Sequence, residues 1–240
     1  MKNMYSRATY GAIVLLAITA IGVALYLGKI EIKDLGTGMR ALRGTLMGAT
    51  LAFRLNEDKE AKKEHAAQRV ALNRALFVLG RQRNAVALIA RALEPFKTPF
   101  DRAFNFPAAK VPPYADLIHH FDELEFLLNS PDVNTLFRLT VEQERFHQVL
   151  ESLLARNDFY LREVQPEIAK HQLNGKSHSE EDVAELFGER VFRTAVNGST
   201  ILRENLDSSL KSLPEMNNDL RNVAKKLFPT HKFVNFKNEA

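Results

Sequence analysis

Cysteine and tryptophan are both absent from this chain of 240 residues. Without cysteine the chain can form no disulfide bond and no thiolate metal site, and it offers no thiol nucleophile. This absence suits a reducing cytoplasm and an oxidising compartment equally well. Without tryptophan, an aromatic belt at a membrane surface would have to use the tyrosines near the N-terminus, Tyr5, Tyr10 and Tyr26.

The sequence also lacks the short motifs that mark common catalytic sites. Neither glycine-rich phosphate-binding pattern is present, and no GxSxG or HExxH motif occurs. No stretch alternates apolar and polar residues in the way that a half-buried strand does. We therefore expect an all-α protein that is not an enzyme, with no catalytic residue, cofactor or metal.

Charge is nearly balanced, with 33 lysines and arginines against 29 aspartates and glutamates and a net charge of +4. Basic residues are mixed with acidic ones over most of the length, so the sequence does not indicate nucleic-acid binding. The roughly 180 residues that follow the N-terminal segment are enough to bury a hydrophobic core of their own.

One long uncharged run lies near the N-terminus, at residues 11–27. With Tyr10 and Gly28 it would form a helix of about 28 Å, close to the thickness of the bilayer hydrocarbon. A cleaved signal peptide is the alternative, but its apolar run would be shorter and a small-residue cleavage site would follow. We predict an N-terminal tail at residues 1–9 and an uncleaved transmembrane helix at residues 10–28, in the cell membrane.

A weaker amphipathic pattern occupies residues 29–56. An arginine at the centre of a membrane span costs about 2.5–3.5 kcal/mol, whereas a leucine returns only about 0.5 kcal/mol. We therefore predict an interfacial helix that lies on the bilayer, with a second span or an ordinary soluble helix as alternatives. The apolar stripe is Leu35, Met39, Leu42, Leu46 and Phe53, and the flanking arginines are Arg40, Arg43 and Arg54.

The distribution of basic residues predicts the orientation of a single-pass chain. Only Lys2 and Arg7 precede the predicted span, while many lysines and arginines follow it. Because basic residues favour the cytoplasmic side, we expect the main domain in the cytoplasm. The opposite orientation stays open, since two basic residues before a first span are also common in chains whose C-terminus is exported.

Residues 57–240 predict a soluble antiparallel helical bundle with coiled-coil-like seams. Ser179 and Asp182 have the spacing of a capping box, and Pro166 and Pro214 are expected to end or break helices. The proline- and phenylalanine-rich stretch at residues 97–113 is expected to cover one end of the bundle. The predicted helices are 57–94, 114–128, one that starts at Ser130 and Pro131, one that starts at Ser179, and a short helix after Pro214.

The most regular apolar stripe is the one that steps by three and four from residue 136 to residue 164. Gln143 and Asn157 interrupt it, and polar residues inside such a seam commonly fix the register of paired helices. A local water contact is the alternative explanation. We predict that Gln143, Phe146 and Asn157 mediate self-association or contact with a protein partner. The stripe comprises Leu136, Leu139, Gln143, Phe146, Leu150, Leu153, Asn157, Tyr160 and Val164.

Three functions are compatible with these patterns. The leading hypothesis is a membrane-anchored interaction or scaffold protein whose partners are the lipid bilayer and another protein. A ligand-sensing bundle outside the cytoplasm is the alternative. A di-metal carboxylate enzyme ranks third, because Glu144 with His147 and Asp116 with His119 have a suitable spacing but fall on outward helix faces.

Overall fold

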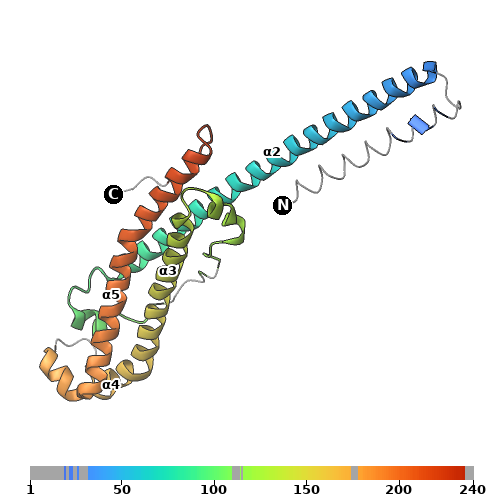
Figure 1. Cartoon of the computed structure of the whole chain (residues 1–240). Coiled ribbons are helices and arrows are strands. Elements are labelled where there is room, and N and C mark those ends of the chain that lie inside the picture. Colours follow the sequence, from blue (N-terminus) through green and yellow to red (C-terminus); the bar gives the residue numbers. More distant parts are fainter. Residues whose placement is uncertain are drawn as a thin grey trace. The chain divides into compact units, whose positions relative to one another are not determined.

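The computed structural model describes residues 19, 22, 23, 26, 32–109, 114, 116–173 and 178–235, which belong to two compact units, residues 1–64 and 65–240. The described part is all-α and contains no strand, as predicted. Elements η1 and η3 are π-helical turns and η2 is a 3-10 helix. The elements are α2 (Ile32–Leu93), η1 (Asp101–Asn105), η2 (Asp122–Asn129), α3 (Asn134–Phe159), η3 (Tyr160–Val164), α4 (Gln165–Lys170) and α5 (Glu180–Leu227) (Figure 1).

The predicted transmembrane helix at residues 10–28 lies outside the described residues, apart from Thr19, Gly22, Val23 and Tyr26. Among the helices that the structure describes, none combines the length and the apolar character that crossing a membrane requires.

Helix α2 joins two segments that the sequence analysis kept apart, the amphipathic stretch up to residue 56 and the helix predicted from residue 57. It runs without interruption from Ile32 to Leu93. No proline occurs within it, and the charged stretch at its middle is rich in glutamate, lysine and alanine, which are good helix formers. Gly44 and Gly48 weaken a helix by about 1 kcal/mol each but do not end it here.

In the second unit, α2, α3 and α5 contribute to one hydrophobic core. Helices α3 and α5 lie side by side (Figure 1). They run antiparallel, because residues later in α3 contact residues earlier in α5. The contacts that show this are Arg138 with Asp219, Glu142 with Ser212, and Ser152 with Asn205.

The prediction of a helix at residues 114–128 is largely wrong. Only Asp122–Asn129 is helical, as the 3-10 element η2, and the described residues before it are irregular. The physical reason is that side chains satisfy the backbone of this stretch. The Leu117 carbonyl accepts a hydrogen bond from Gln82 at 2.8 Å, and the His119 amide donates to Gln143 at 3.1 Å. The next helix, α3, begins at Asn134 and not at Ser130.

Prolines interrupt the helices less than the sequence predicted. Pro166 lies in the first turn of α4, directly after the π turn η3, where a missing amide proton costs little. Pro214 lies inside α5, which continues to Leu227 without the predicted break. The one described interruption of α5 is Gly188, whose φ of 74° and ψ of 153° are not helical. The capping box at Ser179 and Asp182 is confirmed, with bonds of 3.1 and 3.3 Å.

Two apolar segments outside the long helices pack against the bundle. In the phenylalanine-rich stretch, Phe104 is buried, and its ring centroid lies 5.6 Å from that of Phe187. This contact fits the expectation that the stretch covers one end of the bundle. Near the C-terminus, Phe233 is buried, and the Val234 amide donates to Asn73 of α2 at 3.1 Å. Both contacts lie within the second unit.

Gly188 provides a test of the α5 geometry. Its φ and ψ fall in a region that is nearly restricted to glycine, so Gly188→Ala should lower the free energy of unfolding by about 1–3 kcal/mol. Gly198→Ala is the matched control, because a Cβ there meets no atom within 4 Å and the helix should gain about 0.5–1 kcal/mol. Urea denaturation followed by circular dichroism measures both. Equal effects of the two substitutions would contradict the interruption at Gly188.

Candidate functional site

Gln143 lies inside the bundle and is 6% exposed. Its carbonyl oxygen accepts from the His119 amide at 3.1 Å and from the Gln82 side chain at 3.0 Å. Its amide nitrogen lies 3.3 Å from the Leu117 carbonyl and 2.9 Å from the His147 ring nitrogen. Gln143 thus links α3 to α2 and to the irregular stretch between them.

Asn157 has the same kind of role in the last turn of α3. Its side-chain oxygen accepts from the Ala109 amide at 3.3 Å, and its side-chain nitrogen donates to the Ala109 carbonyl at 2.6 Å. Both polar groups of one backbone residue are satisfied by one side chain. Asn157 therefore fastens the stretch that follows η1 to helix α3.

Phe146 is fully buried, at 0% exposure, between these two polar residues. Its ring lies 6.2 Å from the ring of Tyr114. The structure thus brings Gln143, Phe146 and Asn157 onto one inward face of α3, where all three are buried. A partner could reach them only if the bundle opened, so Phe146→Asp would report on folding and not on partner binding.

Arg156, which the sequence analysis did not single out, is the most heavily bonded side chain of this region. It is buried, and its guanidinium donates to the carbonyls of Arg102 at 3.0 Å, Ala103 at 3.2 Å and Pro107 at 3.3 Å, and also to that of Phe106. Burial lowers the pKa of Arg156 to about 10, so it stays charged at neutral pH. Its charge is stabilised by carbonyl dipoles without an ion-pair partner among the described residues.

The ring of Tyr160 also contacts this guanidinium, with a distance of 4.6 Å from the Arg156 carbon to the ring centroid. Beside the pair lies a largely apolar cavity of about 310 Å³ between α3 and α5. The small residues Ala155, Ala195 and Gly198 leave this space open, and the π turn η3 forms part of its wall. Such turns are frequent at functional sites. The cavity can accept an apolar group, whereas Arg156 is already engaged by carbonyls.

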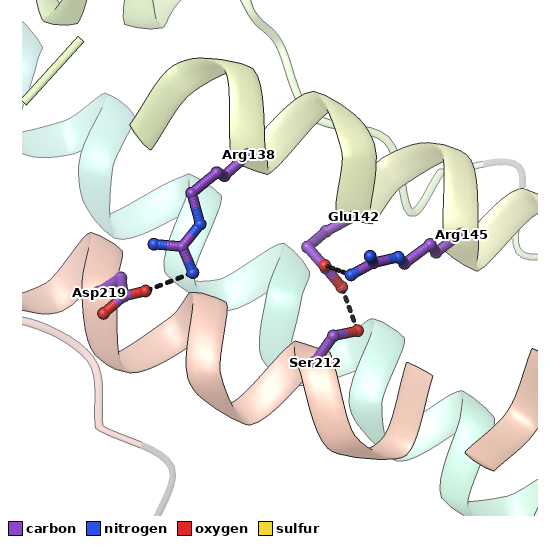
Figure 2. A network of polar contacts seen from close by, with 5 residues as sticks. All are labelled: Arg138, Glu142, Arg145, Ser212 and Asp219. Carbon is purple, nitrogen blue, oxygen red and sulfur yellow. Dashed lines mark hydrogen bonds and ion pairs between the residues drawn. The ribbon is translucent and has the colours of Figure 1, made fainter. Parts of the chain in front are cut away.

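A second polar cluster joins α3 to α5. One carboxylate oxygen of Glu142, which is buried, accepts from Arg145 at 2.5 Å, and the other accepts from the Ser212 hydroxyl at 2.6 Å. Figure 2 shows Arg138 reaching Asp219 nearby, at 2.6 Å. Because both oxygens of Glu142 already accept hydrogen bonds, this carboxylate is arranged to hold two helices together and not to serve as a general base.

His119 lies inside the protein, not on the outward face predicted for it, because residues 116–120 are not helical. Its side chain is 6% exposed, and neither ring nitrogen has a hydrogen-bond partner in the described part of the chain. Burial, with a smaller contribution from the neighbouring His120, lowers the pKa of His119 to about 4. His119 is therefore neutral at physiological pH.

The two acid–histidine pairs do not converge. Glu144, His147 and Asp116 are exposed while His119 is buried. In the described ranges, no group of three or more histidine, aspartate or glutamate side chains is placed to hold a metal ion.

Comparison with known proteins identifies no relative of this chain, since no family, curated protein or solved structure matches it.

His119 generates a prediction about pH. Its folded-state pKa lies below the unfolded value of about 6.5, so the unfolded chain binds more protons between pH 4 and 6.5. Its contribution to stability is complete above pH 6.5 and is lost as the pH falls towards 4, at up to about 1.4 kcal/mol per unit. His119→Leu should make the loss of stability in this window less steep, while His120→Leu, at an exposed position, should change the slope much less, because His120 is the smaller cause of the lowered His119 pKa.

Urea unfolding at several pH values between 4 and 7 measures this difference. The slope of the unfolding free energy against pH is compared among wild type and the two variants. If all three slopes coincide, His119 does not titrate in the way that its burial requires.

Proposed function

We propose that this protein is a membrane-anchored helical interaction or scaffold protein, not an enzyme, whose bundle lies in the cytoplasm. The uncharged run at residues 11–27 supports the anchor. The excess of basic residues after that run supports the cytoplasmic orientation. The protein partner, or a second copy of the chain, would contact the outer surface of the bundle.

The observation that carries the proposal is the exposed apolar surface of α2 in the first unit. Among its side chains, Met47 is 74% exposed and Phe53 is 62% exposed. The sequence between residues 35 and 56 contains no acidic residue, whereas Arg43 and Arg54 are exposed there. Exposed apolar side chains on a basic helix fit the interface of a bilayer that carries anionic lipids. The exposed apolar set is Leu46, Met47, Leu51, Phe53 and Leu55.

The second unit supports a non-enzymatic role. Four of its buried polar side chains, Gln143, Glu142, Arg156 and Asn157, are bonded to the chain's own backbone or to neighbouring side chains. Such an arrangement fits a rigid body that presents a surface.

The anchor is tested with the full-length chain. Wild type should stay with membranes after alkaline carbonate extraction. Leu15→Arg combined with Ala20→Arg should release it, because each arginine near the centre of a span costs about 2.5–3.5 kcal/mol. Ala61→Arg combined with Ala67→Arg, at exposed positions of α2, adds the same charge elsewhere and should leave the chain with the membrane. Extraction of wild type would disprove the anchor.

A second candidate function is a ligand-sensing bundle outside the cytoplasm. The observation that favours it is the apolar cavity of about 310 Å³ beside Tyr160. Pockets of this size with few polar groups are typical of small-molecule sites. The two candidates differ in the side of the membrane on which the bundle lies.

Topology separates the two candidates. The chain has no native cysteine, so Ser208→Cys, at an exposed position of α5, gives a single reporter thiol. We expect a membrane-impermeant maleimide to label it only after the cells are lysed. Labelling in intact cells would place the bundle outside and favour the sensing function.

A further inference from the structure

The second unit contains another hollow, an open cleft of about 590 Å³ between the end of α2 and the middle of α5. Four of the side chains that line it are basic and one is acidic. The basic side chains come from four separate segments. They are Arg91 of α2, Lys97 of the following loop, Arg102 of η1 and Arg203 of α5, and the acid is Glu94.

These positive charges are poorly neutralised by the chain itself. Arg203 forms an ion pair with Asp207 at 2.9 Å. Arg91, Lys97 and Arg102 form no ion pair with any residue that the structure describes. The carboxylate of Asp101, next to Arg102, accepts hydrogen bonds from Thr98 and Asn105 and interacts with the Arg102 charge without forming an ion pair. Charges of one sign in one cleft repel each other, and a bound anion would relieve that repulsion.

Arg102 is held in a fixed orientation at this cleft. One of its terminal nitrogens donates to the carbonyl of Phe96 at 3.2 Å and to that of Lys97 at 2.7 Å. Its Nε atom is buried and has no hydrogen-bond partner in the described part of the chain. Because Nε is buried, a ligand in the open cleft would contact Arg102 through its terminal nitrogens.

The position of the cleft beside a helix C-terminus does not account for all of these charges. A basic residue in the last turn of a helix interacts favourably with the helix dipole, which explains Arg91. Arg102 and Arg203 belong to other elements and are not at the end of α2. Their convergence on the same cleft needs a different reason.

The rest of the lining is apolar. Leu93 is buried, and Phe96 and Leu210 are partly buried and pack against the main core. A ligand that matches both parts of the lining carries an anionic group and an apolar body.

We propose that this cleft binds a ligand with a phosphate group, held by Arg91, Lys97, Arg102 and Arg203, and with an apolar part placed against Leu93 and Leu210. Arginine side chains bind phosphate oxygens in pairs through two N–H groups, which makes them well suited to this group. Either a soluble organic phosphate or the head group of an anionic lipid carries this chemistry. The proposal concerns the bundle alone and is independent of the anchor.

The test uses the full-length protein in an uncharged detergent and isothermal titration calorimetry. One arm titrates inorganic pyrophosphate, which represents a soluble phosphate source. The other titrates mixed micelles that contain phosphatidic acid, with phosphatidylcholine micelles as the reference. We expect saturable binding in at least one arm, and the arm that responds identifies the source.

Two double variants test whether the ligand binds in the cleft. Arg91→Gln combined with Lys97→Gln changes two exposed side chains that make no described ion pair, and it should raise the Kd at least tenfold. Lys225→Gln combined with Lys232→Gln removes the same charge at exposed positions outside the cleft lining and should leave the Kd within twofold. Raising the salt concentration should weaken binding to wild type, because exposed charges are screened.

Two results would overturn the proposal. One is the absence of saturable binding in both arms. The other is an equal loss of affinity in the two double variants, which would show a response to net charge and not to the cleft. Circular dichroism of both double variants checks that each retains the wild-type helix content.

Discussion

The second unit depends on how it satisfies the backbone of the crossover between α2 and α3, which is largely irregular outside the short helices η1 and η2. This stretch carries buried phenylalanines, so its amides and carbonyls are drawn into the interior with them. Buried backbone groups need hydrogen-bond partners, and an irregular chain cannot supply them by itself. Arg156 and Asn157 satisfy one part of the crossover, and Gln82 and Gln143 satisfy the other.

This constraint explains why the most conspicuous polar residues of the seam are not available to a partner. Gln143 and Asn157 occupy interior positions of α3, as their spacing predicted, but they bond mainly to the crossover. The apolar residues of α2 around Phe53 are exposed, and Arg91 and Lys97 of the basic cleft are exposed and form no described ion pair.

Helix boundaries illustrate the same competition between local and tertiary forces. Pro166 and Pro214 are strong local breakers, yet a preceding π turn and a continuous buried face let the helices pass through both. From Leu202 to Val223 the buried residues of α5 recur every three or four positions, on both sides of Pro214. Packing of that face outweighs the loss of one backbone hydrogen bond. Gly188, which carried no signal beyond its residue type, is where α5 departs from helical geometry.

The sequence by itself determined the helical class, the inward face of α3 and the capping box at Ser179, because each follows from periodicity or from contacts within a few residues. It could not determine that residues 116–120 are irregular, that His119 is buried or that Arg102 and Arg203 share a cleft. Those features depend on partners dozens of residues away, such as Gln82 for Leu117 and Asn157 for Ala109. Local patterns record the preference of a segment for helix, whereas only the folded chain decides which backbone groups a distant side chain will bind.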